Sequence, residues 1–311
     1  MKTMEWRKLG LVFAPQNAGG WMKTHAQVPT PLLCEGYIRV YFASRPEPNL
    51  SLTSFVDLDA DDPTRILRVN SNSIVAPGAP GTFDEHGVMP SCAIRTGNKV
   101  FLYYSGWSRS GSVPYTNSTG LAISHDGGET FEKVSEGPVL GKSISDPYSA
   151  TSPVVLKEEN TWHMWYCSGT GWLEIGARYE HTYDIKYACS DNGIDWLPSG
   201  RTCIAQRTEE EAITRPFVIK NPDGYHMWFC HRGSRTFRDG PDGYRIGHAH
   251  SDDLRRWQRD DHINYLPPSA SGWDSKMVAY PALIRTNGRT FMFYNGNDFG
   301  ASGFGVAICQ S

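Results

Sequence analysis

Hydrophobic and polar positions follow a pattern that recurs five times along this chain. Each copy has a polar or acidic cluster, a proline, a short apolar run, a turn of Gly, Asn or Asp residues, and a second run rich in aromatic residues. The copies begin near His25, Asp84, Asp146, Thr208 and Asp274. Their aligned prolines are 59, 63, 63 and 65 residues apart and are Pro31, Pro90, Pro153, Pro216 and Pro281. Five copies at one period predict a repeat architecture.

Two further strand patterns follow in each repeat. In the second, third and fourth copies a Ser-x-Asp type of turn leads to an aromatic residue, which is Phe131, Trp196 or Trp257. Four strands per unit at this period are typical of propeller blades. We therefore expect an all-β, five-bladed β-propeller with four antiparallel strands per blade, as one domain over residues 1–311. The last copy shows only three strands, so the N-terminal strand around Trp6 is expected to complete it and close the ring.

The paired strands are apolar on both faces, as in the segments HMWYC and FMFY. This pattern is expected for strands that are covered on both sides, so most aromatic residues are predicted to lie in the core. The turns between strands should lie on one face of the propeller. Asp126, Asp191 and Asp252 in these turns are expected to stabilise the turns and to take no part in chemistry.

Propeller geometry predicts where a functional site lies. The first strand of each blade lines the central channel, and neighbouring strands alternate in direction. Residues before the first strands and after the second strands therefore meet at one mouth. Those before the first strands are His25, Gln27, Asp84, Glu85, His86, Asp146, Tyr148, Glu211, Thr214, Arg215, Asp274, Lys276 and Tyr280. Those after the second strands are Ser44, Arg45, Trp107, Trp172, His231, Arg232, Asn297 and Asp298.

These residues predict a polar funnel with aromatic walls. Any one of them is as readily explained as a loop cap or as one partner of a salt bridge. Carboxylates from four blades are harder to explain in that way, because carboxylates that face one another shift each other's pKa values and can form an acid/base pair.

Composition limits the class of ligand. The net charge is −3 and 20% of residues are charged, so the basic surface of a nucleic-acid-binding protein is absent and no nucleic-acid partner is expected. Aromatic residues make up 12% of the chain, which suits both a β protein and stacking against sugars. No His/Cys cluster has the spacing of metal ligands, so we expect no metal and no cofactor.

Cysteine use and the N-terminus bear on the compartment. None of the seven cysteines forms a CxxC pair, and Cys167, Cys189, Cys230 and Cys309 lie in apolar patterns, which predicts buried thiols in a reducing compartment. The N-terminus lacks the apolar region of a signal peptide, and no apolar run of 18 residues follows. We therefore expect a cytoplasmic protein with no membrane partner, although a chain trimmed of its signal peptide would look the same.

At these residues the chain resembles the five-bladed propellers of the furanosidase-like glycoside hydrolases, families 43, 32, 62 and 68. It is more loosely similar to the family 130 mannoside phosphorylases. The similarity covers the whole chain as architecture. Its specific features are the acidic residue before each proline-led first strand and the turn from Ser251 to Trp257. The resemblance implies a carbohydrate substrate or ligand and a glycosidic bond as the site of reaction.

The resemblance also implies catalytic roles. Asp146 would correspond to the aspartate of the third blade, which adjusts pKa values, and Glu211 to the general acid of the fourth. The first blade offers His25 and Gln27 where the family has a catalytic aspartate. Asp84 or Glu85 would then replace that carboxylate, or His25 would act as the base.

The remaining funnel residues would bind substrate. Trp107 and Trp172 would stack against a sugar face, and four basic residues would hold an anionic substituent such as a carboxylate or phosphate, or would pair with funnel carboxylates. The full set of candidate binding residues is Arg45, His86, Trp107, Trp172, Arg215, His231, Arg232, Tyr280 and Asp298.

Three alternatives stay open. The chain is a catalytically silent carbohydrate-binding propeller, or it is a phosphorylase of the family 130 type, which needs one acid and a phosphate pocket. The segment from Ser124 to Phe131 also resembles the Asp-box of sialidases, with Tyr280 as a nucleophile, but sialidases have six blades and five repeats argue against them.

Overall fold

The computed structural model describes residues 5–238, 240–260 and 265–310. The described strands fall into five antiparallel units. Unit 1 contains β2 (Thr24–Leu33), β3 (Tyr37–Arg45), β4 (Leu52–Asp59) and β5 (Ile66–Val69). Unit 2 contains β6 (Gly87–Thr96), β7 (Lys99–Arg109), β8 (Tyr115–Ser124) and β9 (Glu132–Lys133). Unit 3 contains β10 (Ala150–Glu158), β11 (Thr161–Ile175), β12 (Arg178–Ser190) and β13 (Leu197–Ile204).

Unit 4 contains β14 (Ala212–Asn221), β15 (Gly224–Arg232), β16 (Arg245–Ser251) and β17 (Gln258–Arg259). Unit 5 contains β18 (Ala279–Thr286), β19 (Arg289–Asn295), β20 (Phe304–Gln310) and β1 (Glu5–Phe13). Helical structure in the described ranges is limited to the 3-10 turn η1 (Pro15–Asn17) and the short turn α1 (Asn297–Gly300). The molecule is therefore all-β.

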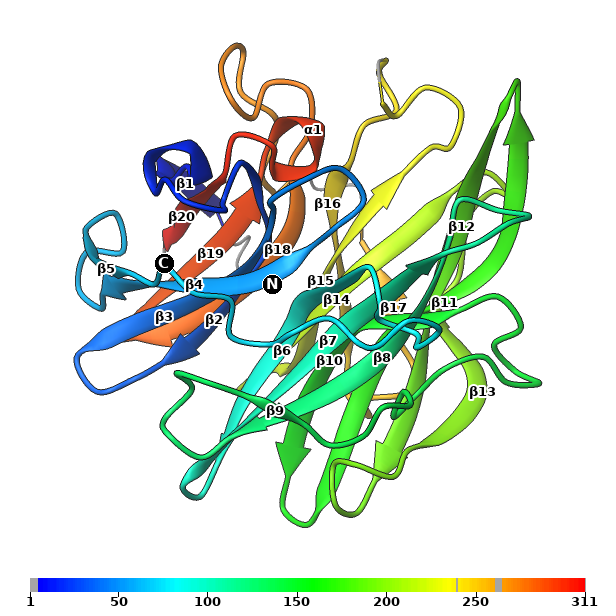
Figure 1. Ribbon diagram of the computed structural model, residues 1–311, viewed down its shortest axis with the longest axis horizontal. Helices are drawn as coiled ribbons and strands as arrows, with labels where there is room; N and C mark the ends of the chain where they lie inside the picture. The colour runs from blue at the N-terminus through cyan, green and yellow to red at the C-terminus, as the bar shows by residue number, and fades with distance from the viewer. Residues whose placement is uncertain (1–4, 239, 261–264, 311) are drawn as a thin grey trace.

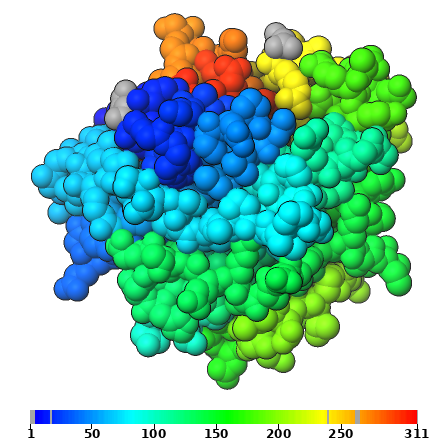
Figure 2. Space-filling model, in the orientation of Figure 1, coloured from blue at the N-terminus to red at the C-terminus, as the bar shows by residue number. Residues whose placement is uncertain are grey.

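The two ends of the chain share one sheet. β1 pairs antiparallel with β20, so the order in unit 5 is β1-β20-β19-β18. In Figure 1 the blue N-terminal strand and the red C-terminal strands lie together, and in Figure 2 blue and red residues adjoin on the surface.

The first strands of the units touch in cyclic order. β2 contacts β6, β6 contacts β10, β10 contacts β14, β14 contacts β18, and β18 contacts β2. Units 2, 3 and 4 are also joined edge to edge by the parallel pairs Ala150–Ser118 and Tyr183–Ala212. The β11–β12 hairpin is the longest, and it projects beyond its neighbours at the right of Figure 1.

Four first strands carry a bulge whose first residue has a positive φ. These residues are Val28, Ser152, Arg215 and Tyr280. The freed main-chain N–H of each one donates to a side chain on the second strand of the preceding unit. The acceptors are Asn295 Oδ1 at 2.8 Å, Ser105 Oγ at 3.0 Å, Cys167 Sγ at 3.2 Å and Cys230 Sγ at 2.7 Å, respectively.

In unit 2 the equivalent residue is Pro90, and the equivalent of the acceptor is Ala43 on β3. A proline has no N–H and an alanine has no acceptor, so both partners of the bond are missing together.

The bulges correct the alignment of the prolines. In β2 the bulge lies between Gln27 and Thr30, so Pro29, and not Pro31, occupies the place of Pro153. In β6 that place is taken by Ser91, one residue after Pro90. Two prolines stand close together in the first copy, and a pattern of single residues cannot decide between them.

The aromatic second strands form the core, which confirms that prediction. Trp165, Trp228 and Tyr104 are fully buried. All seven cysteines are free thiols; Cys167 and Cys230 are buried, but Cys189 and Cys309 are only partly buried, contrary to the expectation for these two.

The turns also follow the expected pattern, with a shift of one residue. Asp126 accepts the main-chain N–H of Glu129 at 2.9 Å. In the next two units the corresponding acceptors are Asn192 and Asp253, which directly follow Asp191 and Asp252. The side chains that hold these turns therefore obey a Ser-x-Asn/Asp pattern.

Candidate functional site

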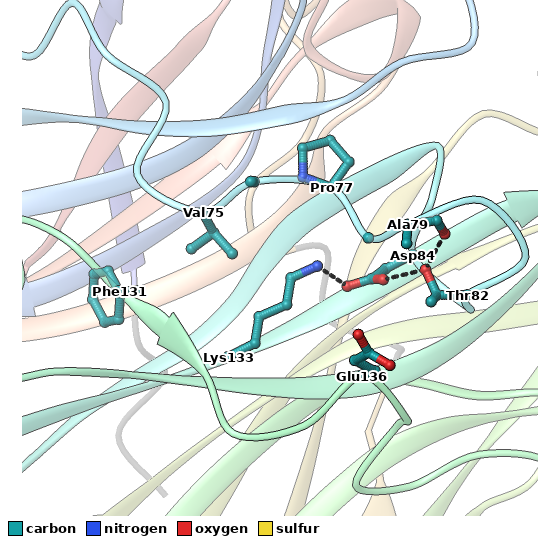
Figure 3. Close-up of a pocket in the computed structure, with 10 residues that line it drawn as sticks. Val75, Pro77, Ala79, Thr82, Asp84, Phe131, Lys133 and Glu136 are labelled. Atoms are coloured by element: carbon teal, nitrogen blue, oxygen red, sulfur yellow. Dashed lines mark hydrogen bonds and ion pairs between the residues drawn. The ribbon is translucent and has the colours of Figure 1, made fainter.

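The acidic residues ahead of the first strands belong to a repeated side-chain arrangement. Asp84 is almost fully buried, accepts a hydrogen bond from the Tyr104 hydroxyl at 2.9 Å, and pairs with Lys133 Nζ at 2.6 Å. Tyr104 lies on the second strand of the unit and Lys133 on its fourth. Figure 3 shows Lys133 and Asp84 reaching toward each other at the edge of a pocket of about 290 Å³, which Phe131 and Thr82 also line.

Units 3 and 5 repeat this arrangement. Asp146 accepts from the Tyr166 hydroxyl at 3.1 Å and pairs with Lys186 at 3.3 Å. Asp274 accepts from the Tyr294 hydroxyl at 3.0 Å and pairs with Lys8 at 2.6 Å. In all three units the aspartate and its tyrosine are 20 residues apart. We call each set of acid, ring and cation a support.

Unit 4 has a variant of the support. Glu211 forms a bidentate pair with Arg259, at 2.9 and 3.2 Å, and the Arg259 guanidinium lies over the ring of Phe229 at 5.2 Å. Glu211 also accepts the main-chain N–H of Arg207 at 2.6 Å and lies 3.8 Å from His231 Nδ1. Its side chain is 11% exposed, whereas those of Asp84 and Asp146 are 1% and 0% exposed.

Unit 1 has an apolar version. With Pro29 as the aligned proline, the position that matches Asp146 is Met22, and the ring opposite the bulge is Phe42, again 20 residues later. Both side chains are buried in the same cluster. The first-unit residue that corresponds to the predicted catalytic aspartate is therefore Met22, and not His25 or Gln27.

The supports bear on the predicted convergence of carboxylates. Among the described residues, the hydrogen bonds and ion pairs of Asp84, Asp146 and Glu211 stay within their own units. A proton donor or nucleophile must be able to reach a substrate. Of these three acids, Glu211 is the least enclosed.

A second group of residues gathers where the strands of units 1, 4 and 5 end, and we call it the mouth cluster. Arg45, the last residue of β3, donates from Nη2 to Gln27 Oε1 at 3.1 Å. Gln27 in turn hydrogen-bonds the hydroxyl of Tyr280 in β18. The ring of Tyr280 lies 5.5 Å from that of Tyr244, which accepts from Arg232 Nε at 3.3 Å. Three units thus contribute to one connected set of polar side chains.

The mouth cluster perturbs its titratable groups. Burial lowers the pKa of His25 to about 4, and the nearby charge of Arg45 adds to this effect. The His25 ring is held by Thr24 Oγ1, 2.9 Å from Nδ1, and by the main chain of Asp298. Burial raises the pKa of Tyr280 well above its usual range. His25 is therefore neutral at neutral pH, and Tyr280 keeps its proton.

An aromatic wall from units 2 and 3 stands beside Arg232. Arg232 donates from Nη2 to the main-chain oxygen of His181 at 2.9 Å. The ring of Trp172 stacks on that of His181 at 4.0 Å, and Tyr115 lies edge-on to Trp172 at 5.1 Å. Tyr115 and Tyr183 share a hydrogen bond of 2.9 Å between their hydroxyls. One face of Trp172 is thus occupied by His181.

His181 is buried, yet neither of its ring nitrogens has a hydrogen-bond partner among the described residues. The buried hydroxyls of Ser149, Thr151 and Ser168 in the same unit are also without a partner there. Burial lowers the pKa of His181 to about 3, with Arg232 and Lys142 contributing, so the ring is neutral. Buried polar atoms without a protein partner commonly bind water or ligand atoms.

Arg215 has an internal position. Its guanidinium is buried and donates to Ser91 Oγ at 2.7 Å, Thr30 Oγ1 at 2.9 Å and the Pro29 carbonyl at 3.2 Å. Burial lowers its pKa to about 10. These contacts join the first strands of units 1, 2 and 4, and they occupy the side chain that the sequence suggested for substrate binding.

The remaining predicted residues form a separate group on unit 2. His86 lies 3.4 Å from Glu85 Oε1, and its ring is 5.7 Å from that of Trp107. Glu85 also accepts the main-chain N–H of Gly81 at 2.8 Å. Glu85, His86 and Trp107 are partly exposed, as are His231 and Tyr280, and Asp298 is exposed in the turn α1.

Sequence reasoning missed part of the mouth. Tyr115, His181 and Tyr183 lie on third strands, and Tyr244 precedes one, so none followed the rule that selected the ends of first and second strands. The buried pair of Glu180 with Arg238, at 2.8 and 2.9 Å, was missed for the same reason. A length signal existed, because the segment between copies is longest where the β11–β12 hairpin forms.

No group of three or more His, Cys, Asp or Glu side chains among the described residues could hold a metal ion. In the same part of the chain, no helix has the length and apolar character needed to span a membrane.

Comparison with known proteins defines the class. The fold is that of a group of propeller-like glycoside hydrolases. Among them are BT0996 in an RGII complex (16% identity, 97% of this protein and 90% of BT0996, TM-score 0.76) and a glycosyl hydrolase from Bacteroides ovatus (16% identity, 98% and 90%, TM-score 0.71). The Bombyx mori GH32 beta-fructofuranosidase BmSUC1 is also similar (13% identity, 98% and 61%, TM-score 0.61).

By sequence, the chain belongs to the same family as the uncharacterized protein Rv1502 of Mycobacterium tuberculosis, to which it is 37% identical over 99% of its own length and all of that protein. No family model matches the chain.

Proposed function

We propose that this protein is a glycoside hydrolase-like enzyme that acts on a carbohydrate at the mouth cluster of a closed, single-domain, five-bladed propeller. The cyclic contacts of the five first strands, the pairing of β1 with β20, and the bonds from each bulge to the preceding unit support the ring. The observation that carries the functional proposal is the mouth cluster itself, because strand ends from three units present convergent polar groups beside an aromatic wall in a fold shared with glycoside hydrolases.

Glu211 is the proposed general acid. It is a glutamate where the other supports have aspartate, its ring partner Phe229 has no hydroxyl, and His231 on the partly exposed end of β15 lies beside it. To donate a proton, Glu211 must first be released from Arg259. Asp84, Asp146 and Glu85 are weaker candidates for the second carboxylate, and His25 is the candidate base of the mouth cluster, since its ring is neutral.

The test is a turnover screen with aryl glycosides and oligosaccharides, comparing the natural protein with Glu211→Gln. Loss of the acid is expected to lower kcat at least about a hundredfold with little change in KM. Glu209→Gln, in the same exposed loop, is the matched control and should leave kcat unchanged. A Glu211→Gln protein that folds normally and retains kcat within twofold would remove the assignment.

Arg259→Met separates a structural role from a catalytic one. If Glu211 serves only as a support, Arg259→Met and Glu211→Gln should lower the melting temperature by similar amounts, and neither should change turnover per folded molecule.

A catalytically silent carbohydrate-binding protein is the second candidate. It is favoured by the ion pairs that hold Asp84, Asp146, Asp274 and Glu211 inside their own units. It predicts sugar binding by calorimetry with no release of product from any glycoside in the screen, whereas hydrolysis predicts both.

A further inference from the structure

Arg45 has an unusual hydrogen-bonding position. A guanidinium carries five N–H groups, and in Arg45 one of them, on Nη2, has a partner among the described residues, which is the Gln27 carbonyl oxygen at 3.1 Å. The side chain is partly exposed at the end of β3. The other N–H groups of Arg45 are therefore available to a ligand.

The hydrogen-bond direction next to Arg45 is fixed by Gln27. Its amide oxygen accepts from Arg45, so its amide nitrogen is the group that meets the hydroxyl of Tyr280. An amide nitrogen donates, so the Tyr280 oxygen accepts and its own proton is free to be donated elsewhere. Arg45 and Tyr280 thus offer a ligand only hydrogen-bond donors.

The charge around these donors is positive. Within the described part of the chain, Arg45, Arg215 and Arg232 form no ion pair, and their partners are amide, carbonyl and hydroxyl groups. The acids of the supports are each matched by a cation of their own unit. Their negative charge is thus compensated locally, and the arginines of the mouth lack such compensation.

We propose that Arg45 and Tyr280 bind an oxyanion at the mouth, which is either the carboxylate of an acidic sugar or inorganic phosphate. A guanidinium presents a planar fork that matches two oxygens of either group, and charge-assisted bonds of this kind are stronger than neutral ones. This inference rests on the proposed carbohydrate function for the first of the two anions. Neutral sugars would leave the guanidinium without an anionic partner.

Calorimetry with matched ligands tests the inference. Methyl glucuronide and methyl galacturonide are titrated beside their methyl esters, which keep the ring and remove the charge, and inorganic phosphate is titrated alone. The natural protein is expected to bind at least one anion about tenfold more tightly than its neutral counterpart, or phosphate with a measurable affinity. Arg45→Met should abolish this preference, and Arg45→Lys should restore part of it.

Tyr280→Phe removes the second donor and should weaken the anion several-fold while neutral esters are unaffected. Arg65→Met, a loss of an exposed arginine that pairs with Asp59, is the control and should change nothing. Equal binding of acids and esters together with no binding of phosphate, or a preference that survives Arg45→Met, would overturn the inference.

The same titrations distinguish the two anions and the two proposals. Preference for the acid sugar identifies a carboxylate, and binding of phosphate with no preference among sugars identifies phosphate. A protein that hydrolyses only neutral glycosides through Glu211 keeps the proposed function and loses the oxyanion site. One that binds an anion through Arg45 without turnover keeps the site and loses hydrolysis.

Discussion

The supports and the mouth cluster use similar residues in opposite ways. In the supports, each acid meets a cation and a ring inside one unit, so charge and hydrogen bonding are satisfied locally. In the mouth cluster, Arg45 and Arg232 meet neutral partners, and the contacts cross from one unit to another. The difference indicates that the supports stabilise the repeat, whereas the mouth keeps unsatisfied donors for a ligand.

The largest effect is expected from removing the acid of a buried support. Asp146→Ala leaves the Lys186 ammonium buried without its carboxylate, which should destabilise the fold by about 3–5 kcal/mol. Urea denaturation measures the change. Binding and turnover per folded molecule should survive at low temperature, and a selective loss of turnover in a protein of normal stability would place Asp146 in the active site instead.

The second largest effect is expected at Arg215. Arg215→Met leaves the Pro29 carbonyl and the Ser91 and Thr30 hydroxyls without their donor, and should cost about 2–4 kcal/mol of unfolding free energy. The melting temperature is the readout, with Arg65→Met as a matched exposed control. A melting temperature equal to that of the natural protein would show that these contacts add no net stability and would free Arg215 for a role in binding.

Acid should reveal the neutral histidine of the mouth wall. The pKa of His181 falls from 6.5 to about 3 on folding, so the unfolded state takes up a proton first as the pH drops below 6.5. The stability that His181 contributes is present above about pH 6.5 and is lost as the pH falls toward 3. At pH 4 the loss is up to about 3 kcal/mol.

Replacing the histidine tests this pH dependence. His181→Phe keeps a ring against Trp172 and should flatten the decline of melting temperature between pH 6.5 and 4. A decline as steep as that of the natural protein would assign the acid sensitivity to other groups.

The smallest effect is expected from a single hydroxyl. Tyr104→Phe keeps the ring and removes the bond to Asp84, which also keeps Lys133, so the cost should be about 1 kcal/mol. Comparing it with Tyr294→Phe asks whether the supports are interchangeable. Two values that differ by more than about 2 kcal/mol would mean that the repeated geometry does not carry a repeated energy.

The sequence predicted the repeat and the core more fully than the site. Aromatic second strands such as the one containing Trp165 are recognisable because both faces of the strand are apolar. The cations of the supports were not predictable in this way. Lys133 and Lys8 lie 49 and 266 residues from their aspartates, and only folding brings them together.

One signal was present in the sequence and was informative. The interval of 20 residues between Asp84 and Tyr104 recurs in two other copies, which marks these acids as members of a pair. The direction of the Gln27 amide and the reach of Arg215 between first strands depend on positions in space, so no pattern along the chain encodes them.

Unit 1 shows what a support becomes without charge. Met22 and Phe42 keep the interval of 20 residues and replace both the carboxylate and the phenol by apolar groups. The chain thus contains a natural double substitution of its own motif, made where the repeat tolerates it. Methionine and phenylalanine can therefore be transplanted together to the positions of Asp84 and Tyr104, with Lys133 changed to methionine, as a ready-made design for a blade whose stability does not depend on salt or acidity.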